Sequence, residues 1–236
     1  PNHQQPVHTT LQSQSRNTQM AVMAARLVLA FLLAAASVLS ASAVDSKLTL
    51  HNLCPFAVYP LITPNTGLPS ISDNTVTLNA NGRGLVSFPF PPTTWSGRVV
   101  ARTGCTSPAD CDTGLAAPET VVQLVVHSPD AGPAADLATY SVSLAEGFNI
   151  GAVVSPQFIG GGQCPALGCP VNLNDDCPAD QRVVGKDGGV VACKGDAGYF
   201  KQRCPLTRVN GSDHEHVPQN CLAPGELKIV FCQTAM

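Results

Sequence analysis

The stretch KLTLHNLCPFAVYPLI, residues 47–62, contains two short runs of alternating apolar and polar residues around Asn52-Leu53-Cys54-Pro55. Alternation with a period of two is typical of a β-strand with one buried face, and Asn and Pro favour a turn between strands. This stretch therefore predicts two strands joined by a turn that carries a cysteine.

Strand patterns recur along the rest of the chain. Residues 97–105, 119–128, 138–149 and 226–232 read as further strands, and residues 74–90 predict a hairpin with its turn between Asn79 and Gly84. Residues 160–203 are rich in Gly, Cys, Pro and Asp, which predicts a disulfide-held loop region. No segment has the period of a convincing amphipathic helix. Many short strands favour an all-β fold, either a sandwich or a barrel.

The beginning of the chain does not have the pattern of folded structure. Residues 1–19 are polar without an apolar period, and we interpret them as an upstream or non-native extension. Residues 20–43 contain Arg26, an apolar run of about a dozen residues and the small residues Ala41-Ser42-Ala43, which is the pattern of a signal peptide cleaved after Ala43. The run is too short and too rich in serine for a membrane-spanning helix. We therefore expect a secreted mature domain over residues 44–236.

The charge balance restricts the class of partner. Only 12% of the residues are charged, and without Arg16 and Arg26 the mature part has 11 basic and 16 acidic residues. A chain with this balance has no basic patch of the kind that binds phosphate backbones. We expect a monomer that does not bind nucleic acid.

All ten cysteines lie in the predicted mature domain. An even number behind a signal peptide predicts five disulfides formed in an oxidising compartment. No second closely spaced pair accompanies Cys164 and Cys169, so the spacing does not indicate a zinc site. A bond between Cys54 and Cys232 would close nearly the whole mature chain into one loop, where a cross-link removes the most unfolded-state entropy. The spacing alone leaves the pairing open.

Six segments in order resemble the thaumatin-like proteins, a plant pathogenesis-related family. They are LTLHNLCPFAVYP, GRVVARTGC, YSVSLAEGFN, CPALGCPVNLNDDCP, YFKQRCP and VFCQTA, and together they span residues 48–235. The resemblance implies a β-sandwich with a reduced disulfide-rich loop domain beside it. It also implies the pairs Cys54–Cys232, Cys105–Cys111, Cys164–Cys221, Cys169–Cys204 and Cys177–Cys193. Larger members have more cysteines, and those absent here would form complete bridges, which indicates a coherent smaller variant.

The resemblance also points to a cleft. Larger members of the family carry an acidic cleft between the sandwich and the loop domain, lined by one Arg, one Glu and three Asp. Transferred to this sequence, these positions are Arg98 or Arg102, Gln123, Ser141, Glu146 and Asp213. Arg98 and Arg102 stand on one predicted strand with the same parity, so both are expected on one face.

Two of the acidic positions therefore carry no acid. Hydrolysis of a glycosidic bond needs two carboxyl groups, one as the acid and one as the base or nucleophile. Gln123 has an amide, which cannot move the proton. Glu146 and Asp213 remain as weak catalytic candidates, and Glu146 before a glycine also fits a solvated turn residue. We expect a binding protein more than an enzyme.

The remaining polar features are a histidine motif, a sequon and one tryptophan. His214-Glu215-His216 lacks the spacing that puts two imidazoles on one helix face, so we expect no metal there and no cofactor elsewhere. Asn210-Gly211-Ser212 is a glycosylation sequon. Trp95 is expected to pack in the interior. The sequence shows no Ser-His-Asp order typical of a hydrolase.

These observations lead to one main hypothesis and one alternative. The main hypothesis is a secreted, antifungal plant defence protein of the apoplast that binds a microbial cell-wall β-glucan or inhibits a microbial hydrolase such as a xylanase. The alternative is a weak endo-β-1,3-glucanase.

Overall fold

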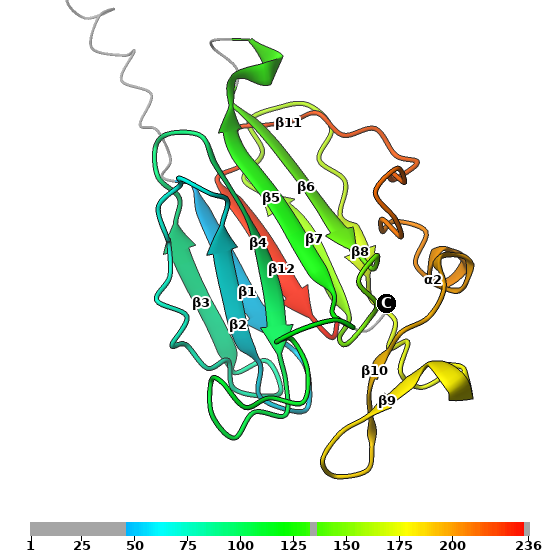
Figure 1. Cartoon of the computed structure of the whole chain (residues 1–236). Coiled ribbons are helices and arrows are strands. Elements are labelled where there is room, and N and C mark those ends of the chain that lie inside the picture. The colour runs from blue at the N-terminus through cyan, green and yellow to red at the C-terminus, as the bar shows by residue number, and fades with distance from the viewer. Residues whose placement is uncertain (1–45, 133–135, 234–236) are drawn as a thin grey trace, which may run out of the picture. The chain divides into compact units, whose positions relative to one another are not determined.

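The computed structural model describes residues 46–132 and 136–233 (Figure 1). The predicted N-terminal extension, the signal peptide and its cleavage site lie outside the described residues. No helix among the described residues is long and apolar enough to cross a membrane.

Two five-stranded sheets form the main body of the fold (Figure 1). The first has the order β3 (Gly84–Pro89), β1 (Lys47–Asn52), β12 (Glu226–Phe231), β7 (Ala152–Gln157) and β8 (Leu167–Cys169). Strands β1 and β12 run parallel, and the remaining pairs are antiparallel. The second sheet is antiparallel and has the order β11 (Cys221–Leu222), β6 (Leu137–Ser143), β5 (Val121–Ser128), β4 (Trp95–Arg102) and β2 (Tyr59–Pro64).

The main hydrophobic core contains buried side chains from both sheets. Leu50 of β1 and Ile229 of β12 belong to the same cluster as Leu124 of β5 and Tyr140 of β6. Trp95 is completely buried there, and its indole nitrogen donates to the carbonyl of Pro69 at 2.9 Å, so it packs in the interior as expected. Strands whose alternate side chains are buried on one face form the two packed sheets of the β-sandwich that the sequence predicted.

The loop region beside the sandwich has its own smaller core. It contains the hairpin of β9 (Arg182–Val184) and β10 (Val190–Cys193), helix α2 (Ala197–Arg203) and the short helix η2 (Ala179–Gln181); a further short helix, η1 (Pro129–Ala131), follows β5. Four of the eight buried residues in this core are cysteines, next to Leu144, Phe148, Leu173 and Phe200. Disulfides therefore supply much of the cohesion that a small apolar core cannot.

All ten cysteines are paired. The five bonds are Cys54–Cys232, Cys105–Cys111, Cys164–Cys221, Cys169–Cys204 and Cys177–Cys193, the pairs that the family resemblance implies. Such a complete set is typical of proteins made in an oxidising compartment.

Three local features differ from the sequence-based expectation. Residues 74–90 do not form a hairpin, because β3 pairs with β1 and Leu78 pairs with Val58. The Asn52 amide donates to the carbonyls of Leu78 and Asn79 and holds that segment against the end of β1. The sequence did not single out β7, and it did not reveal α2, a helix of seven residues with one buried side chain.

Candidate functional site

A row of polar side chains crosses the middle of the second sheet. Arg98 on β4 lies directly opposite Gln123 on β5, and Gln123 lies opposite Ser141 on β6. Directly opposed residues in a sheet share one face, so the three side chains form a row. The Ser141 hydroxyl is 3.4 Å from the Gln123 side-chain oxygen and donates to it. Arg98 and Gln123 are exposed, whereas Ser141 is buried.

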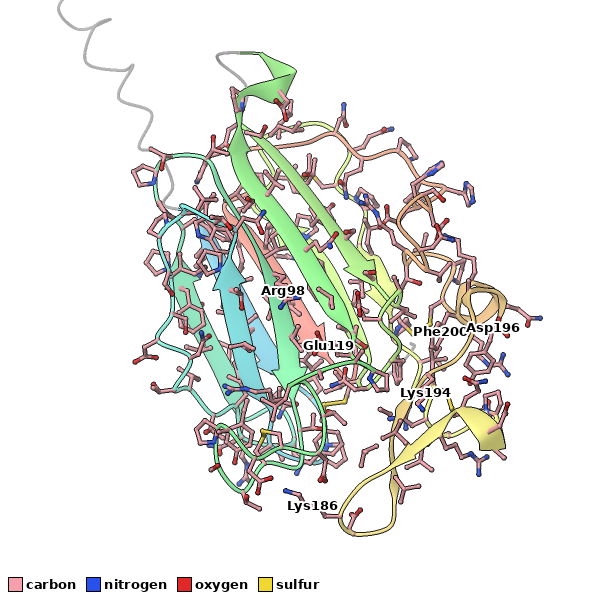
Figure 2. The ribbon with its side chains drawn as sticks, in the orientation of Figure 1. Arg98, Glu119, Lys186, Lys194, Asp196 and Phe200 are labelled. Atoms are coloured by element: carbon pink, nitrogen blue, oxygen red, sulfur yellow. A yellow bond between two sulfur atoms is a disulfide. The ribbon has the colours of Figure 1, made fainter. Side chains whose placement is uncertain are left out.

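Two glutamates stand beside this row, at the edge of the sheet where β5 begins and β6 ends. Glu119 lies just before β5, and its backbone nitrogen donates to the carbonyl of Glu146, in the turn after β6, at 3.2 Å. The Asn149 side chain holds this region in place, because it accepts from Thr120 N and donates to the carbonyl of Ala101. Figure 2 labels Arg98 near the middle of the sheet and Glu119 nearer the end at which β5 begins.

We call Arg98, Glu119, Gln123, Ser141 and Glu146 the polar cluster. Its geometry depends on Gly147, which has a φ of +100°. A Cβ at this position would collide with Pro118 and would lie 3.1 Å from the carbonyl oxygen of Cys193. Glycine is therefore required for the turn that carries Glu146 to approach both Glu119 and the loop region.

The two glutamates differ in their surroundings. Glu119 is 9% exposed, and Glu146 is exposed. Burial raises the pKa of the Glu119 carboxyl, the charge of Arg98 opposes this effect, and the nearby Glu146 adds to it. The cluster thus combines a shielded carboxyl that holds its proton more tightly with a second acid in open solvent and a cation.

The structure distinguishes between the two arginines. Arg102 is 5% exposed, and its guanidinium donates to the carbonyls of Tyr59, Pro60, Asn74 and Pro108. Its role is to join β2 and two loops, although it has the same parity as Arg98. Arg98 is the exposed member of the pair and the one that faces Gln123.

Asp213 is engaged in structural contacts. Its carboxylate is 2.8 Å from Lys201 Nζ and accepts from the backbone nitrogen of Val209 at 3.0 Å. Burial works to raise its pKa, but the bonds from Lys201 and Val209 outweigh burial, so the pKa is lowered. The acid whose pKa is raised by the charge of Glu146 is Glu119, not Asp213. The sequence analysis missed Glu119, although it precedes the strand of Gln123 with the same parity.

The histidine motif and the sequon lie in the same loop. Glu215 is 3.1 Å from Arg208 Nε, and the rings of His214 and His216 meet edge to face. Within residues 46–132 and 136–233, no group of His, Cys, Asp or Glu has the arrangement of a metal site. Asn210 is exposed, and its side chain accepts from Ser212.

The fold also joins a serine, a histidine and an aspartate that are distant in sequence. Ser46 Oγ lies 2.7 Å from His127 Nε2, and His127 Nδ1 lies 3.0 Å from Asp136. The sequence order gave no sign of this chain of contacts. Ser46 is buried, and none of the three residues borders either described cavity, so we assign them the task of tethering the start of β1 to the β5–β6 connection.

Comparison with known families identifies the architecture. The profile of the thaumatin family matches residues 52–199. The chain belongs to the thaumatin family. An osmotin-like protein of Solanum lycopersicum is 36% identical over 228 residues, covering 78% of this chain and 88% of the relative. A glucan endo-1,3-beta-glucosidase of Prunus avium, also similar to this thaumatin-family chain, is 32% identical over 168 residues, covering 63% and 64%.

Among solved structures, this thaumatin-family chain is similar to a thaumatin-like xylanase inhibitor. The two chains are 19% identical, with a TM-score of 0.42, over 78% of this chain and 98% of the inhibitor.

Proposed function

We propose that this protein is a secreted plant defence protein whose polar cluster binds a microbial target. The main target is a cell-wall β-glucan, and the other target is a secreted microbial glycoside hydrolase such as a xylanase. Membership of the thaumatin family and the complete set of disulfides support a secreted, rigid scaffold.

The observation that carries the proposal is the row of Arg98, Gln123 and Ser141, with the two glutamates at the nearby edge of the sheet where β5 begins. The exposed Arg98 and Gln123 offer hydrogen-bond donors and acceptors at the spacing of neighbouring strands, about 4.8 Å, and the buried Ser141 donates to the Gln123 amide. This spacing is comparable to the length of one hexose unit, and sugar hydroxyls both donate and accept. Because the row lies on paired strands, binding does not require the site to be ordered first.

The hydrolase target follows from the charge of Arg98. A guanidinium pairs with carboxylates in a bidentate manner, and the active sites of glycoside hydrolases carry two carboxyl groups.

Co-sedimentation with insoluble β-1,3-glucan and inhibition of fungal xylanases and glucanases test the two targets. Wild type and Arg98→Ala are compared, with the exposed Arg83→Ala as the matched control. The proposal expects binding or inhibition that Arg98→Ala reduces at least fivefold and Arg83→Ala does not. If wild type neither sediments with glucan nor inhibits any of the enzymes, the proposal is wrong.

A second candidate function is weak endo-β-1,3-glucanase activity. The observation in its favour is the pair of glutamates, because a shielded carboxyl with a raised pKa beside a second acid is the division of roles that glycoside hydrolysis needs. The relative from Prunus avium carries the name of such an enzyme. Gln123 and Ser141, at positions where the larger relatives are expected to be acidic, count against it.

Release of reducing ends from β-1,3-glucan separates the two functions. If wild type releases sugar, and both Glu119→Gln and Glu146→Gln abolish the release, the protein is an enzyme and Glu119 is its acid. If neither wild type nor the two variants release sugar while wild type still binds glucan, the polar cluster is a binding site only.

A further inference from the structure

A cavity on another part of the molecule is lined by none of the residues of the polar cluster. It has a volume of about 680 Å³ and is bordered by six parts of the chain, which are Cys232 and residues within 53–56, 103–112, 149–151, 170–174 and 187–191. This volume falls within the range of about 300–1,000 Å³ that is usual for sites of small organic ligands.

The rim of this cavity is apolar and exposed. Leu53, Phe56 and Val171 belong to its lining, and they are 38%, 45% and 40% exposed. Large apolar side chains that gather at one hollow, from separate loops, are typical of a surface that a ligand covers. Phe56 is the only aromatic residue in the lining.

The charges at the cavity have one sign. Asp112 and Asp187 are its two charged lining residues, and no lysine or arginine belongs to the lining. Asp187 accepts from the backbone nitrogen of Gly189 at 3.0 Å. Asp112 is half-buried between Gly104 and Gly185, and no hydrogen bond or ion pair joins its carboxylate to another described side chain. A half-buried carboxylate without a partner favours a cation beside it.

The walls are fixed before any ligand arrives. The bonds Cys54–Cys232 and Cys105–Cys111 hold the segments that contribute Leu53 and Asp112. Asn174 donates to the carbonyls of Asn149 and Val191 and so joins two walls. Lys186 on the β9–β10 hairpin pairs with Asp110 at 2.6 Å, and Figure 2 shows Lys186 reaching toward that loop. A preformed site of this kind costs little ordering entropy on binding.

We propose that this cavity binds an organic cation with an apolar body, such as an aromatic or long-chain amine. The ammonium or pyridinium group lies beside the Asp112 carboxylate, and the apolar body covers Leu53 and Val171. Phe56 contributes its ring face to the cation. Anionic molecules of the same size are repelled by both aspartates. The site is independent of glucan binding by the polar cluster.

The test uses three fluorescent probes of similar size and different charge. They are a cationic dialkylaminostyryl-methylpyridinium, neutral N-phenyl-1-naphthylamine and anionic anilinonaphthalene sulfonate. The protein secreted by a eukaryotic host is titrated with each probe. The proposal predicts that the cation binds at least tenfold more tightly than the anion, a difference of the order expected for one well-placed charge pair.

Matched variants locate the binding. Asp112→Asn is expected to lower the affinity for the cationic probe about fivefold and to leave the affinity for the neutral probe unchanged. Phe56→Ala is expected to lower the affinity for the cationic probe about threefold. The controls are Asp130→Asn and Phe158→Ala, an exposed acid and a 73%-exposed phenylalanine outside the lining, and neither is expected to matter. Thermal unfolding confirms that each variant is folded.

Three results would overturn the proposal. These are no binding of the cationic probe at millimolar concentration, equal binding of cation and anion, or a cation affinity that Asp112→Asn leaves unchanged. Val171→Arg places a positive charge at the rim without altering Asp112. This variant must therefore also lower the affinity for the cationic probe. Glucan binding by the same preparations is expected to be unaffected, so failure here is distinguishable from failure of the proposed function.

Discussion

The backbone nitrogen of Glu119 lies 3.2 Å from the carbonyl oxygen of Glu146, and this hydrogen bond joins the start of β5 to the turn after β6. The two residues are 27 positions apart in sequence, yet the charge of Glu146 contributes to the raised pKa of the Glu119 carboxyl. The electrostatics of the polar cluster therefore depend on this contact between two loops.

The first prediction concerns the effect of pH through Glu119. Burial raises the pKa of its carboxyl in the folded protein above the value of about 4.5 for an unperturbed glutamate. When the pKa of a group is raised on folding, its contribution to the free energy of unfolding is fully present below the unfolded pKa. This contribution is lost as the pH rises through the folded pKa. The melting temperature of wild type, relative to Glu119→Gln, should therefore fall as the pH increases above about 4.5 and then level off.

Glu146→Gln provides the control for this experiment. Removal of the neighbouring acid lowers the pKa of Glu119 in the folded protein, so the fall in relative stability should still begin near pH 4.5 but end at a lower pH and be smaller. A difference between wild type and Glu119→Gln that stays constant from about pH 3 to pH 8 would contradict the burial of Glu119.

The second prediction concerns Gly147. Replacement by alanine forces a side chain into a positive φ and into contact with Pro118, so we expect a loss of about 3 kcal/mol in the free energy of unfolding. Gly67→Ala is the matched control, because Gly67 also has a positive φ but has open space around it, and it should cost only about 1 kcal/mol. Chemical denaturation with the disulfides intact measures both. Equal losses would show that the contact with Pro118 is unimportant.

The third prediction separates the two arginines. Arg102→Lys leaves several buried carbonyls without a donor, so it should lower the free energy of unfolding by about 2–3 kcal/mol. Arg98→Lys changes an exposed residue and should stay within about 0.5 kcal/mol. The reverse order in denaturant titrations would mean that the roles of the two residues have been exchanged.

The fourth prediction concerns Asp213. Its pKa is lowered in the folded protein, so its stabilisation is present above the unfolded pKa of about 3.8 and is lost as the pH falls through the folded pKa. Asp213→Asn should cost about 1–2 kcal/mol at neutral pH, and this cost should vanish in strong acid. Glucan binding should be unchanged in the folded variant, whereas a loss of binding without a loss of stability would return Asp213 to the site.

Much of the architecture could be predicted from the sequence, because strand alternation is a local signal. The runs around Leu48 and Leu50, Val122 and Leu124, and Leu227 and Ile229 each place apolar residues on one face, and those side chains are buried. The failed hairpin at residues 74–90 shows the limit of such signals. Its turn residues are present, but the pairing of β3 with β1 depends on a distant strand.

The candidate site was predicted only in part. Arg98, Gln123 and Ser141 were placed from the resemblance, and the sheet register brings them into one row. Glu119 was missed because the resemblance points to position 123 for the acid, and because burial of a loop residue has no local sequence signature. The contact between Ser46 and His127 was invisible for the same reason, since it joins residues 81 positions apart.

The most direct test of the central claim is a binding isotherm on insoluble β-1,3-glucan for wild type, Arg98→Ala and Arg83→Ala, measured with the reducing ends released in the same tubes. The account predicts saturable binding by wild type and Arg83→Ala, a loss of at least fivefold in affinity for Arg98→Ala, and no released sugar. Equal binding by all three proteins would contradict it, because the polar cluster would then not be the surface that holds the glucan.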